Sequence, residues 1–447
     1  MSEFPFSSAL TKRIPFHVAS TKGVRGWQSR LRPERKPPMK PFEINNLEPL
    51  SDPLDALLAD IAINVQLPPS LHDKADGRYG AARTYIERKG SPLEGRVLRF
   101  YPQGSMAIDA TISTRGTDEE YDLDIVAELD IDHNADPATV LKILEDALRD
   151  YPVTRIERQT RCVTLFYADG MHLDVTPASR LPSPNERESH IFHSKPGKRD
   201  DDCLVPMNAW GFCQWYRLRT PFEDRFSKAF NRRMLDAYGL SVRADADVDD
   251  VPEQCPLHIK STVTVALQLL KRFRNILYAD YAGRIPPSVM LSYFAGQTAR
   301  PGLGLAEAVI LQARAIALAI RQASALGRRI VVDNPIFAND CFTDRWPENI
   351  AQQDQFAGHL MDLVRGLEAI RSGDHSIEEI QDWLRDVFGP RVVGRAMAQR
   401  NERVGRTVRS AYQSYTPKGG LLVPAASVII PSPAVARSHT FMGSRKK

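Results

Sequence analysis

The sequence predicts an α+β protein in which a mixed half is followed by an all-helical half. Between residues 97 and 176, short apolar stretches alternate with turn signals and with one helical stretch, a pattern typical of a sheet with packed helices. After about residue 215 apolar residues recur at helical spacing almost to the end of the ordered-looking region. The strands therefore belong to the first half, and helices alone build the second.

The elements of the first half follow from local signals. Asp52 is placed to cap a helix over residues 54–65, with Pro53 at its first position. A second helix is expected over about residues 70–88, and a third opens at Asp136 and reaches about residue 150. Strands are expected over residues 97–101, 123–129, 153–158, 161–167 and 171–176.

The second half carries apolar stripes that predict helices over residues 259–278, 305–325 and 356–370. Ser376 and Glu379 form a capping box that opens a further helix, which ends at Gly389 and Pro390. The predicted organisation is a disordered basic tail, a core, a helical domain and a flexible C-terminal tail: residues 1–38, 39–215, 216–416 and 417–447. The first tail holds eight Lys and Arg without apolar periodicity, and Met39 is an alternative start of the protein.

Composition restricts the class of protein. The 447 residues are 43% hydrophobic and 26% charged, which is typical of a soluble globular protein, and a net charge of +4 does not indicate a protein that coats DNA. The five cysteines include no C-x-x-C pair, so neither a disulfide framework nor a zinc knuckle is expected. No apolar run long enough for a membrane helix and no secretory signal is found. A cytoplasmic protein without membrane association is expected.

Three sequence features combine into one chemical site. Gly104-Ser105 follows a predicted strand, Asp122 and Asp124 enter the next strand, and Asp174 lies within a later one. Alternate residues of a strand share a face, so Asp122 and Asp124 point together while Leu123 points into the core. If the strand of Asp174 lies beside theirs, three carboxylates converge. Such an anionic cluster needs a cation, and hard oxygen ligands suit Mg²⁺ or Mn²⁺ carried by a nucleotide phosphate.

The remaining residues of this site have simple roles. Gly104 lets the backbone approach a phosphate closely, and Ser105 offers a hydroxyl and an N–H group. Other chemistry is not supported, because the sequence contains no P-loop, no nucleophile elbow and no metal-spaced histidine cluster. The residues alone therefore predict nucleotidyl transfer.

These motifs resemble the active site of polymerase-beta-type nucleotidyltransferases. More narrowly, the chain resembles the bacterial CD-NTases of CBASS antiphage defence, relatives of cyclic GMP-AMP synthase and oligoadenylate synthetase. The resemblance spans roughly residues 50–413 and includes further motifs around Lys271, Ser288, Asn208, Asn334 and Trp346. The zinc-binding insertion of animal cyclic GMP-AMP synthase has no counterpart here, so DNA sensing by that route is not supported.

The resemblance implies a bilobed fold, with a polymerase-beta-like core containing a mixed sheet and an all-helical, oligoadenylate-synthetase-like C-terminal domain. It implies that Asp122, Asp124 and Asp174 are catalytic and hold two Mg²⁺ ions, for which Mn²⁺ can substitute. Gly104, Ser105, Lys271 and Ser288 would bind the donor nucleotide. The implied substrates are ATP and GTP, and the favoured product is a cyclic GMP-AMP-type purine dinucleotide. A separate effector protein and an accessory protein at the C-terminal tail are the implied partners, with no obligatory nucleic acid.

Two other functions remain open at this point. The same aspartates serve nucleotidyltransferases that do not cyclise their product and that act on RNA or a small molecule. A catalytically silent nucleotide-binding scaffold is the second alternative. Lys271 also has an alternative interpretation as the solvated edge of its helix, and Ser288 as a helix N-cap.

Overall fold

The computed structural model describes residues 49–67, 69–113, 121–244, 260–373, 375–409, 413–415 and 422–424. All of them belong to one compact unit, Glu43–Lys447. The predicted basic tail, residues 1–38, and Met39 lie outside the described residues. The predicted C-terminal tail also lies outside them, except for Leu422–Pro424.

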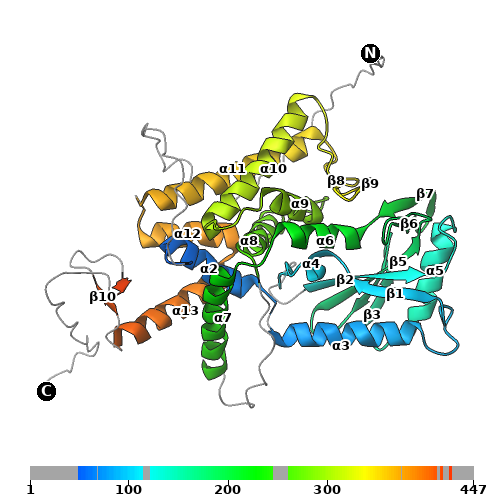
Figure 1. Ribbon diagram of the computed structural model, residues 1–447, viewed down its shortest axis with the longest axis horizontal. Coiled ribbons are helices and arrows are strands. Elements are labelled where there is room, and N and C mark those ends of the chain that lie inside the picture. The colour runs from blue at the N-terminus through cyan, green and yellow to red at the C-terminus, as the bar shows by residue number, and fades with distance from the viewer. Residues whose placement is uncertain are drawn as a thin grey trace. The chain divides into compact units, whose positions relative to one another are not determined.

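A seven-stranded mixed sheet forms the first half (Figure 1). Its strands are β1 (Val97–Pro102), β2 (Tyr121–Leu129), β3 (Arg155–Arg158), β4 (Val163–Phe166), β5 (Met171–Arg180), β6 (Ser189–Lys195) and β7 (Lys198–Met207). The order β1-β2-β5-β4-β3 runs across the sheet, with β6 paired to β5 and β7 paired to β6. The β2–β5 pair is parallel, and the remaining pairs are antiparallel.

Two helices, α3 (Pro69–Ile86) and α5 (Pro137–Leu148), cover one face of this sheet. Ala82 and Ile86 of α3 and Leu144 of α5 join a buried cluster with Leu123 and Leu173 of the central strands. The apolar residues of β2 and β5 thus point into this core, as the alternation predicts. The opposite face of the same two strands is left for polar side chains.

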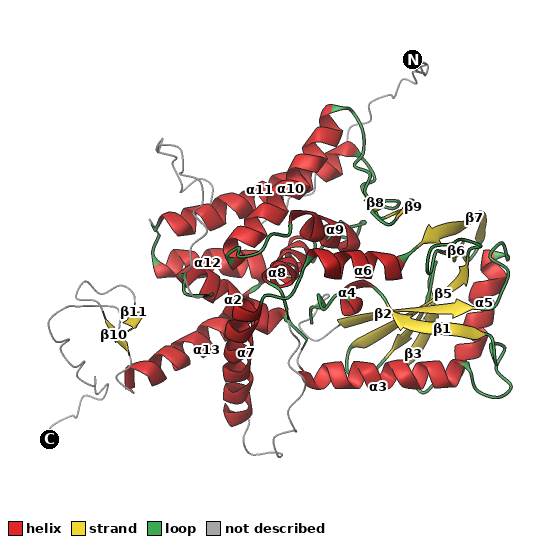
Figure 2. Cartoon of the chain, in the orientation of Figure 1, coloured by secondary structure: helices red, strands yellow, loops and turns green. Residues whose placement is uncertain are grey.

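Helices build the second half, and Figure 2 shows them separated from the strands of the sheet. They are α6 (Ala209–Arg219), α7 (Asp224–Ala244), α8 (Thr262–Leu277), α9 (Ser288–Thr298), α10 (Leu305–Ala325), α11 (Ile350–Ser372), α12 (Ile377–Phe388) and α13 (Pro390–Arg409). The short elements are α4 (Gly104–Ala107), β8 (Asp333–Asn334), β9 (Phe337–Cys341), β10 (Gln413–Tyr415) and β11 (Leu422–Pro424). Helix α8 is central, because residues 262–274 are all buried.

Some elements differ from the prediction. The first helix, α2 (Pro53–Val65), packs against α7, α8, α10 and α13 of the helical half. Strands β6 and β7 were not predicted, because β7 begins with the charged run 198–202, which hides the strand period. The strand is held by its ladder with β6, and Leu204, Val205 and Met207 at its end pack against apolar clusters. Within the described residues, no helix is long and apolar enough to cross a membrane.

Buried Asp60 ties the first helix to two later ones. Its side chain is 1% exposed and lies 2.8 Å from Arg233 of α7 and 3.0 Å from Arg403 of α13. Arg400 of α13 lies 3.8 Å from the same carboxylate. Three guanidinium groups therefore share one buried anion.

We expect Asp60→Asn to destabilise the protein by about 2–4 kcal/mol, because three half-buried arginines lose their shared counter-ion. Chemical unfolding measures this loss. The matched control is Asp224→Asn, which breaks the exposed Lys228–Asp224 pair of α7 and should cost less than about 1 kcal/mol. Equal effects of the two substitutions would contradict the prediction.

Candidate active site

The three predicted aspartates lie on the two central parallel strands. Asp124 of β2 is directly opposite Asp174 of β5, and Asp122 is opposite His172. These four residues are half-buried, whereas Leu123 and Leu173 between them are buried. Side chains of paired residues in neighbouring strands point to the same face. The parallel β2–β5 register thus places all three carboxylates on the face opposite the core.

Neighbouring groups already contact two of these carboxylates. The Thr164 hydroxyl of β4 donates to Asp174 Oδ1 at 2.5 Å. His172 Nδ1 lies 3.5 Å from Asp122 Oδ1. Burial, followed by the charges of Asp174 and Asp124, raises the pKa of the nearby Cys162 thiol. The Cys162 thiol is therefore neutral in the free protein.

Gly104 forms the turn that follows β1. The Gln103 N–H donates to the Asp124 carbonyl at 2.8 Å, which holds this turn beside β2. Gly104 has φ +60, and a Cβ added there would lie 2.6 Å from Asp124 Oδ2. The position thus requires glycine for two reasons, the left-handed backbone and the closeness of the carboxylate. Ser105 follows in α4, and its carbonyl accepts from the Ala110 N–H at 2.9 Å.

Lys271 of α8 reaches the site from the helical half. Its side chain is buried, and Nζ donates to the Ala110 carbonyl at 2.8 Å. Burial and the neighbouring Arg274 lower the pKa of Lys271 to about 7, although Asp124 and Asp122 act in the opposite direction. The alternative interpretation as a solvated helix edge is wrong for this residue.

Ser288 is the first residue of α9, and Pro287 occupies the N-cap position. The Ser288 hydroxyl accepts from Arg274 Nη1 at 2.7 Å. The same guanidinium donates to the Pro286 carbonyl at 2.9 Å. Ser288 is thus not the N-cap of α9, and Arg274 joins the start of α9 to α8.

A pocket of about 460 Å³ brings most of these residues together. Its lining includes six of the predicted site residues: Gly104, Ser105, Asp122, Asp124, Lys271 and Ser288. Asp174 is not part of the lining, but it lies beside Asp124 in the sheet. The sheet, α4, α8 and α9 thus enclose one common space.

The sequence prediction missed several residues of this pocket. Arg274, Asn275 and Tyr278 also line it and follow Lys271 at helical spacings of three, four and seven residues. Residues at these spacings share one face of a helix, so the assignment of Lys271 to the nucleotide site could have predicted them. Phe212 of α6 lines the same pocket, and no local sequence signal marks it.

The motifs around Asn208, Asn334 and Trp346, which belong to the resemblance, have a structural role. Buried Asp340 of β9 accepts from the Asn208 backbone N–H and from Asn334 Nδ2, each at 2.9 Å. Trp346 is 2% exposed and packs edge-on against Phe356 of α11. Asp340 thus connects the β8–β9 hairpin to the start of α6, and Trp346, which follows the hairpin, packs against α11.

The donor set around Asp124 fits a hard divalent cation. Aspartate oxygens are the ligands that Mg²⁺ prefers, and the three carboxylates share one face of two paired strands. No group of three or more His, Cys, Asp or Glu side chains in the described part of the chain is already gathered as a complete metal site.

Replacing Lys271 gives a test of its role. At pH 8, above its pKa of about 7, the free protein holds this amine mostly neutral. A bound triphosphate would favour the ammonium form, so nucleotide binding should take up a proton at pH 8 and almost none at pH 6. Calorimetry in two buffers of different ionisation enthalpy measures this uptake. Lys271→Met should abolish it and weaken nucleotide binding at least about tenfold, and uptake that persists in this variant would contradict the assignment.

Comparisons with known proteins agree with this architecture. The model of the SMODS family, the Second Messenger Oligonucleotide or Dinucleotide Synthetase domain, matches residues 52–187. The chain is 57% identical over 405 residues to the cyclic dinucleotide synthase CdnG of Bradyrhizobium diazoefficiens, covering 89% of this chain and 97% of that protein. It is 23% identical over 359 residues to a c-di-GMP synthase of Roseivirga ehrenbergii, covering 79% and 89%.

Solved structures extend this agreement. The structure of Bradyrhizobium diazoefficiens CdnG in complex with GTP matches with a TM-score of 0.70 and 55% identity, covering 78% of this chain and 99% of that chain. CdnC of E. coli MS115-1, solved with ATP, shares the fold at a TM-score of 0.52 and 14% identity, covering 75% and 97%. The α+β nucleotidyltransferase fold predicted from the sequence is thus confirmed. This chain belongs to the bacterial CD-NTases and is a nucleotidyltransferase of the cyclic dinucleotide synthase type.

Proposed function

We propose that this enzyme joins purine nucleoside triphosphates, GTP among them, into a cyclic dinucleotide with release of pyrophosphate. The observation that carries the proposal is the pocket in which Gly104, Asp124 and Lys271 meet from the sheet, α4 and α8. GTP is supported by the complex of the CdnG relative with that nucleotide. The c-di-GMP synthase among the relatives supports a product that contains guanine.

Each residue has a distinct part in the proposed reaction. Asp122 and Asp124 would hold two Mg²⁺ ions, and Asp174 would hold the ion beside the acceptor hydroxyl. When bound, such ions activate the attacking hydroxyl and neutralise the leaving pyrophosphate. The Gly104–Ser105 turn and Lys271 bind the donor triphosphate and orient it for attack.

Other residues that line the pocket around Lys271 would position the nucleotide. Arg274 holds the start of α9, so Ser288 faces the pocket at a fixed place. Tyr278 and Phe212 line the same space and offer aromatic surface to a base. A linear dinucleotide that turns over in this pocket would present its own hydroxyl for the second linkage.

The biological role proposed for the product is signalling in antiphage defence through a separate effector protein. This role rests on family membership and on the resemblance to CBASS enzymes. An accessory protein that engages the C-terminal tail is the second partner proposed. Deletion of the effector gene from a host that carries the system should remove protection against phage, while product synthesis continues.

The central experiment incubates the protein with all four NTPs and Mg²⁺ and identifies products by mass spectrometry. Phosphatase-resistant material with two phosphodiesters is expected. A GMP-AMP product, as predicted from the sequence, is separated by mass from a product with two guanines. Long linear chains on an added RNA primer would instead favour the non-cyclising alternative, and no turnover would favour the silent scaffold.

A further inference from the structure

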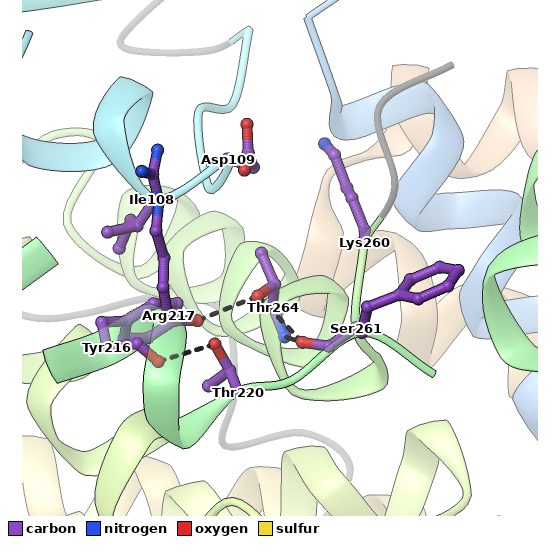
Figure 3. A pocket seen from close by; sticks show the side chains of 9 residues that line it. Ile108, Asp109, Tyr216, Arg217, Thr220, Lys260, Ser261 and Thr264 are labelled. Atoms are coloured by element: carbon purple, nitrogen blue, oxygen red, sulfur yellow. Dashed lines mark hydrogen bonds between the residues drawn. The ribbon is translucent and has the colours of Figure 1, made fainter. Parts of the chain in front are cut away.

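A second pocket of about 220 Å³ lies beside Ile108 and Asp109, the residues that follow α4 (Figure 3). Its walls come from the residues after α4, the last turns of α6 and the start of α8. The lining is Ile108, Asp109, Tyr216, Arg217, Thr220, Phe222, Lys260, Ser261 and Thr264. Among the described residues, Ile108 alone lines both this pocket and the nucleotide pocket. The second pocket is therefore a separate space within the described residues.

Lys260 is the unusual group of this pocket. Its side chain is 6% exposed, and Nζ donates to Gln66 Oε1 at 2.6 Å. In the described part of the chain Lys260 forms no ion pair, although a buried ammonium without an anion is costly. Burial lowers its pKa to about 8, and the charge of Asp109 counteracts this effect, so the amine still carries its proton at neutral pH.

Two more charged side chains face the same space. Figure 3 shows the charged ends of Arg217, Asp109 and Lys260 on the same side of the pocket, with the hydroxyls of Thr220, Ser261 and Thr264 beyond them. Arg217 Nη2 donates to the Ala107 carbonyl at 2.7 Å, which leaves further donors of its guanidinium available. The start of α8 is already capped by Ser261, and Glu223 accepts from the Thr262 backbone at 3.3 Å. The N-terminus of α8 therefore offers little to a bound anion, and the preference of this pocket for an anion depends on Lys260 and Arg217.

The two pockets share one short segment. Gly104, Ser105 and Thr111 line the nucleotide pocket, whereas Asp109 between them lines the second pocket. Lys271 bonds to the Ala110 carbonyl and Gln268 to the Thr111 carbonyl, both at 2.8 Å. A ligand that moves Asp109 therefore acts on the residue next to the carbonyl that holds Lys271.

We propose that the second pocket is a regulatory site for a small acid that carries a hydrogen-bond donor beside its anionic group, a molecule of amino-acid size. Lys260 and Arg217 bind the anionic group, and Asp109 accepts from the donor. The pocket is smaller than the ~300–1,000 Å³ of sites for drug-sized ligands, so it favours a ligand smaller than a nucleotide. Binding there shifts the 104–111 segment and changes the KM for nucleotide.

The experiment measures the melting temperature of the full chain against increasing L-aspartate and, in a second arm, inorganic phosphate. One or both probes should raise the Tm, and the two arms separate a carboxylate ligand from a phosphate ligand. Lys260→Met should raise the apparent Kd of the bound probe about tenfold or more, because one charge-assisted contact is lost.

Asp109→Asn should act on the two probes in opposite directions. It should weaken binding of L-aspartate, whose ammonium group loses its anionic acceptor, and tighten binding of phosphate, which no longer faces a repelling carboxylate. Asparagine tolerates the left-handed backbone of this position, φ +55, so the variant keeps the local conformation.

Two controls locate the binding event. Lys271→Met should abolish probe binding if the probe occupies the nucleotide pocket, and should retain it, with a changed Kd, if the probe occupies the second pocket. Lys228→Met removes an exposed lysine on α7 and should leave probe binding unchanged. The probe that binds should change the KM for GTP in the parent and not in Lys260→Met.

Lys260→Met or Asp109→Asn could lower the stability of the protein. A general loss of stability would weaken the binding of both probes, whereas the proposal expects Asp109→Asn to affect them in opposite directions. No Tm shift with either probe at tens of millimolar, or a shift of equal size in Lys260→Met, would overturn the binding site. Binding that leaves the KM unchanged would overturn its regulatory role. Product formation by the parent without any probe tests the proposed function separately.

Discussion

Asp122→Asn, Asp124→Asn and Asp174→Asn should each reduce product formation by at least about a thousandfold. Asparagine keeps the size and one acceptor oxygen of aspartate but loses the charge that would hold a divalent ion. Metal ions supply several kcal/mol of transition-state stabilisation, and 1.36 kcal/mol corresponds to a tenfold change in rate. Initial rates with Mg²⁺ and GTP, read by mass spectrometry of the cyclic product, measure this loss.

The same variants should keep their stability without metal. The three carboxylates share one face of β2 and β5, so removing one charge relieves repulsion between them. Thermal melts of the parent and the three variants in the presence of a chelator measure this as a Tm that is unchanged or higher. A structural role for the aspartates instead predicts a lower Tm with a proportionate loss of activity.

A nearby carboxylate provides the matched control. Asp169 lies in the turn before β5 and pairs with Arg78 at 2.8 Å, outside the pocket lining. Asp169→Asn should lower the Tm slightly and leave the rate near that of the parent. We further expect Asp174→Asn to be inactive but able to bind NTP, and complete loss of NTP binding would contradict the division of labour among the aspartates.

The sequence was most informative about features that a single helix or strand determines by itself. The period of a strand fixes the shared face of Asp122 and Asp124, whatever lies beside them. The position of Asp174 needed the parallel pairing of β2 with β5, two strands separated by α5 and the β3–β4 hairpin. Local signals do not determine such a pairing, so the convergence of the three aspartates depended on the resemblance.

Tertiary packing decided the features that sequence reasoning missed. Lys271 is buried because α8 is surrounded by other helices and by the 110–111 segment, and only the fold reveals its bond to Ala110. Phe212 reaches the nucleotide pocket from α6, far along the chain from Gly104. The second pocket is likewise assembled from three distant segments, and nothing in their spacing indicates that Asp109 and Lys260 face one space.

Gly104→Ala should be the most damaging change outside the aspartates, with a loss of about a hundredfold in rate. The residue has φ +60, where an L side chain costs about 1–2 kcal/mol. The new Cβ would also lie 2.6 Å from Asp124 Oδ2, so the carboxylate or the turn must move. A displacement of about 1 Å at a reacting site is enough to cost about a hundredfold.

A second glycine, Gly327, distinguishes the effect of backbone strain from the effect of a displaced carboxylate. Gly327 follows α10 with φ +66, and an added Cβ there meets nothing within 4 Å. Gly327→Ala should therefore lose a similar 1–2 kcal/mol of stability, about the cost of a left-handed alanine, and keep the parent rate. Gly104→Ala should lose at least as much stability and should differ in turnover, because only its Cβ contacts Asp124. If both variants retain activity within about tenfold of the parent, the closeness of Gly104 to Asp124 has no catalytic consequence, and the turn binds the donor phosphate without positioning the carboxylate.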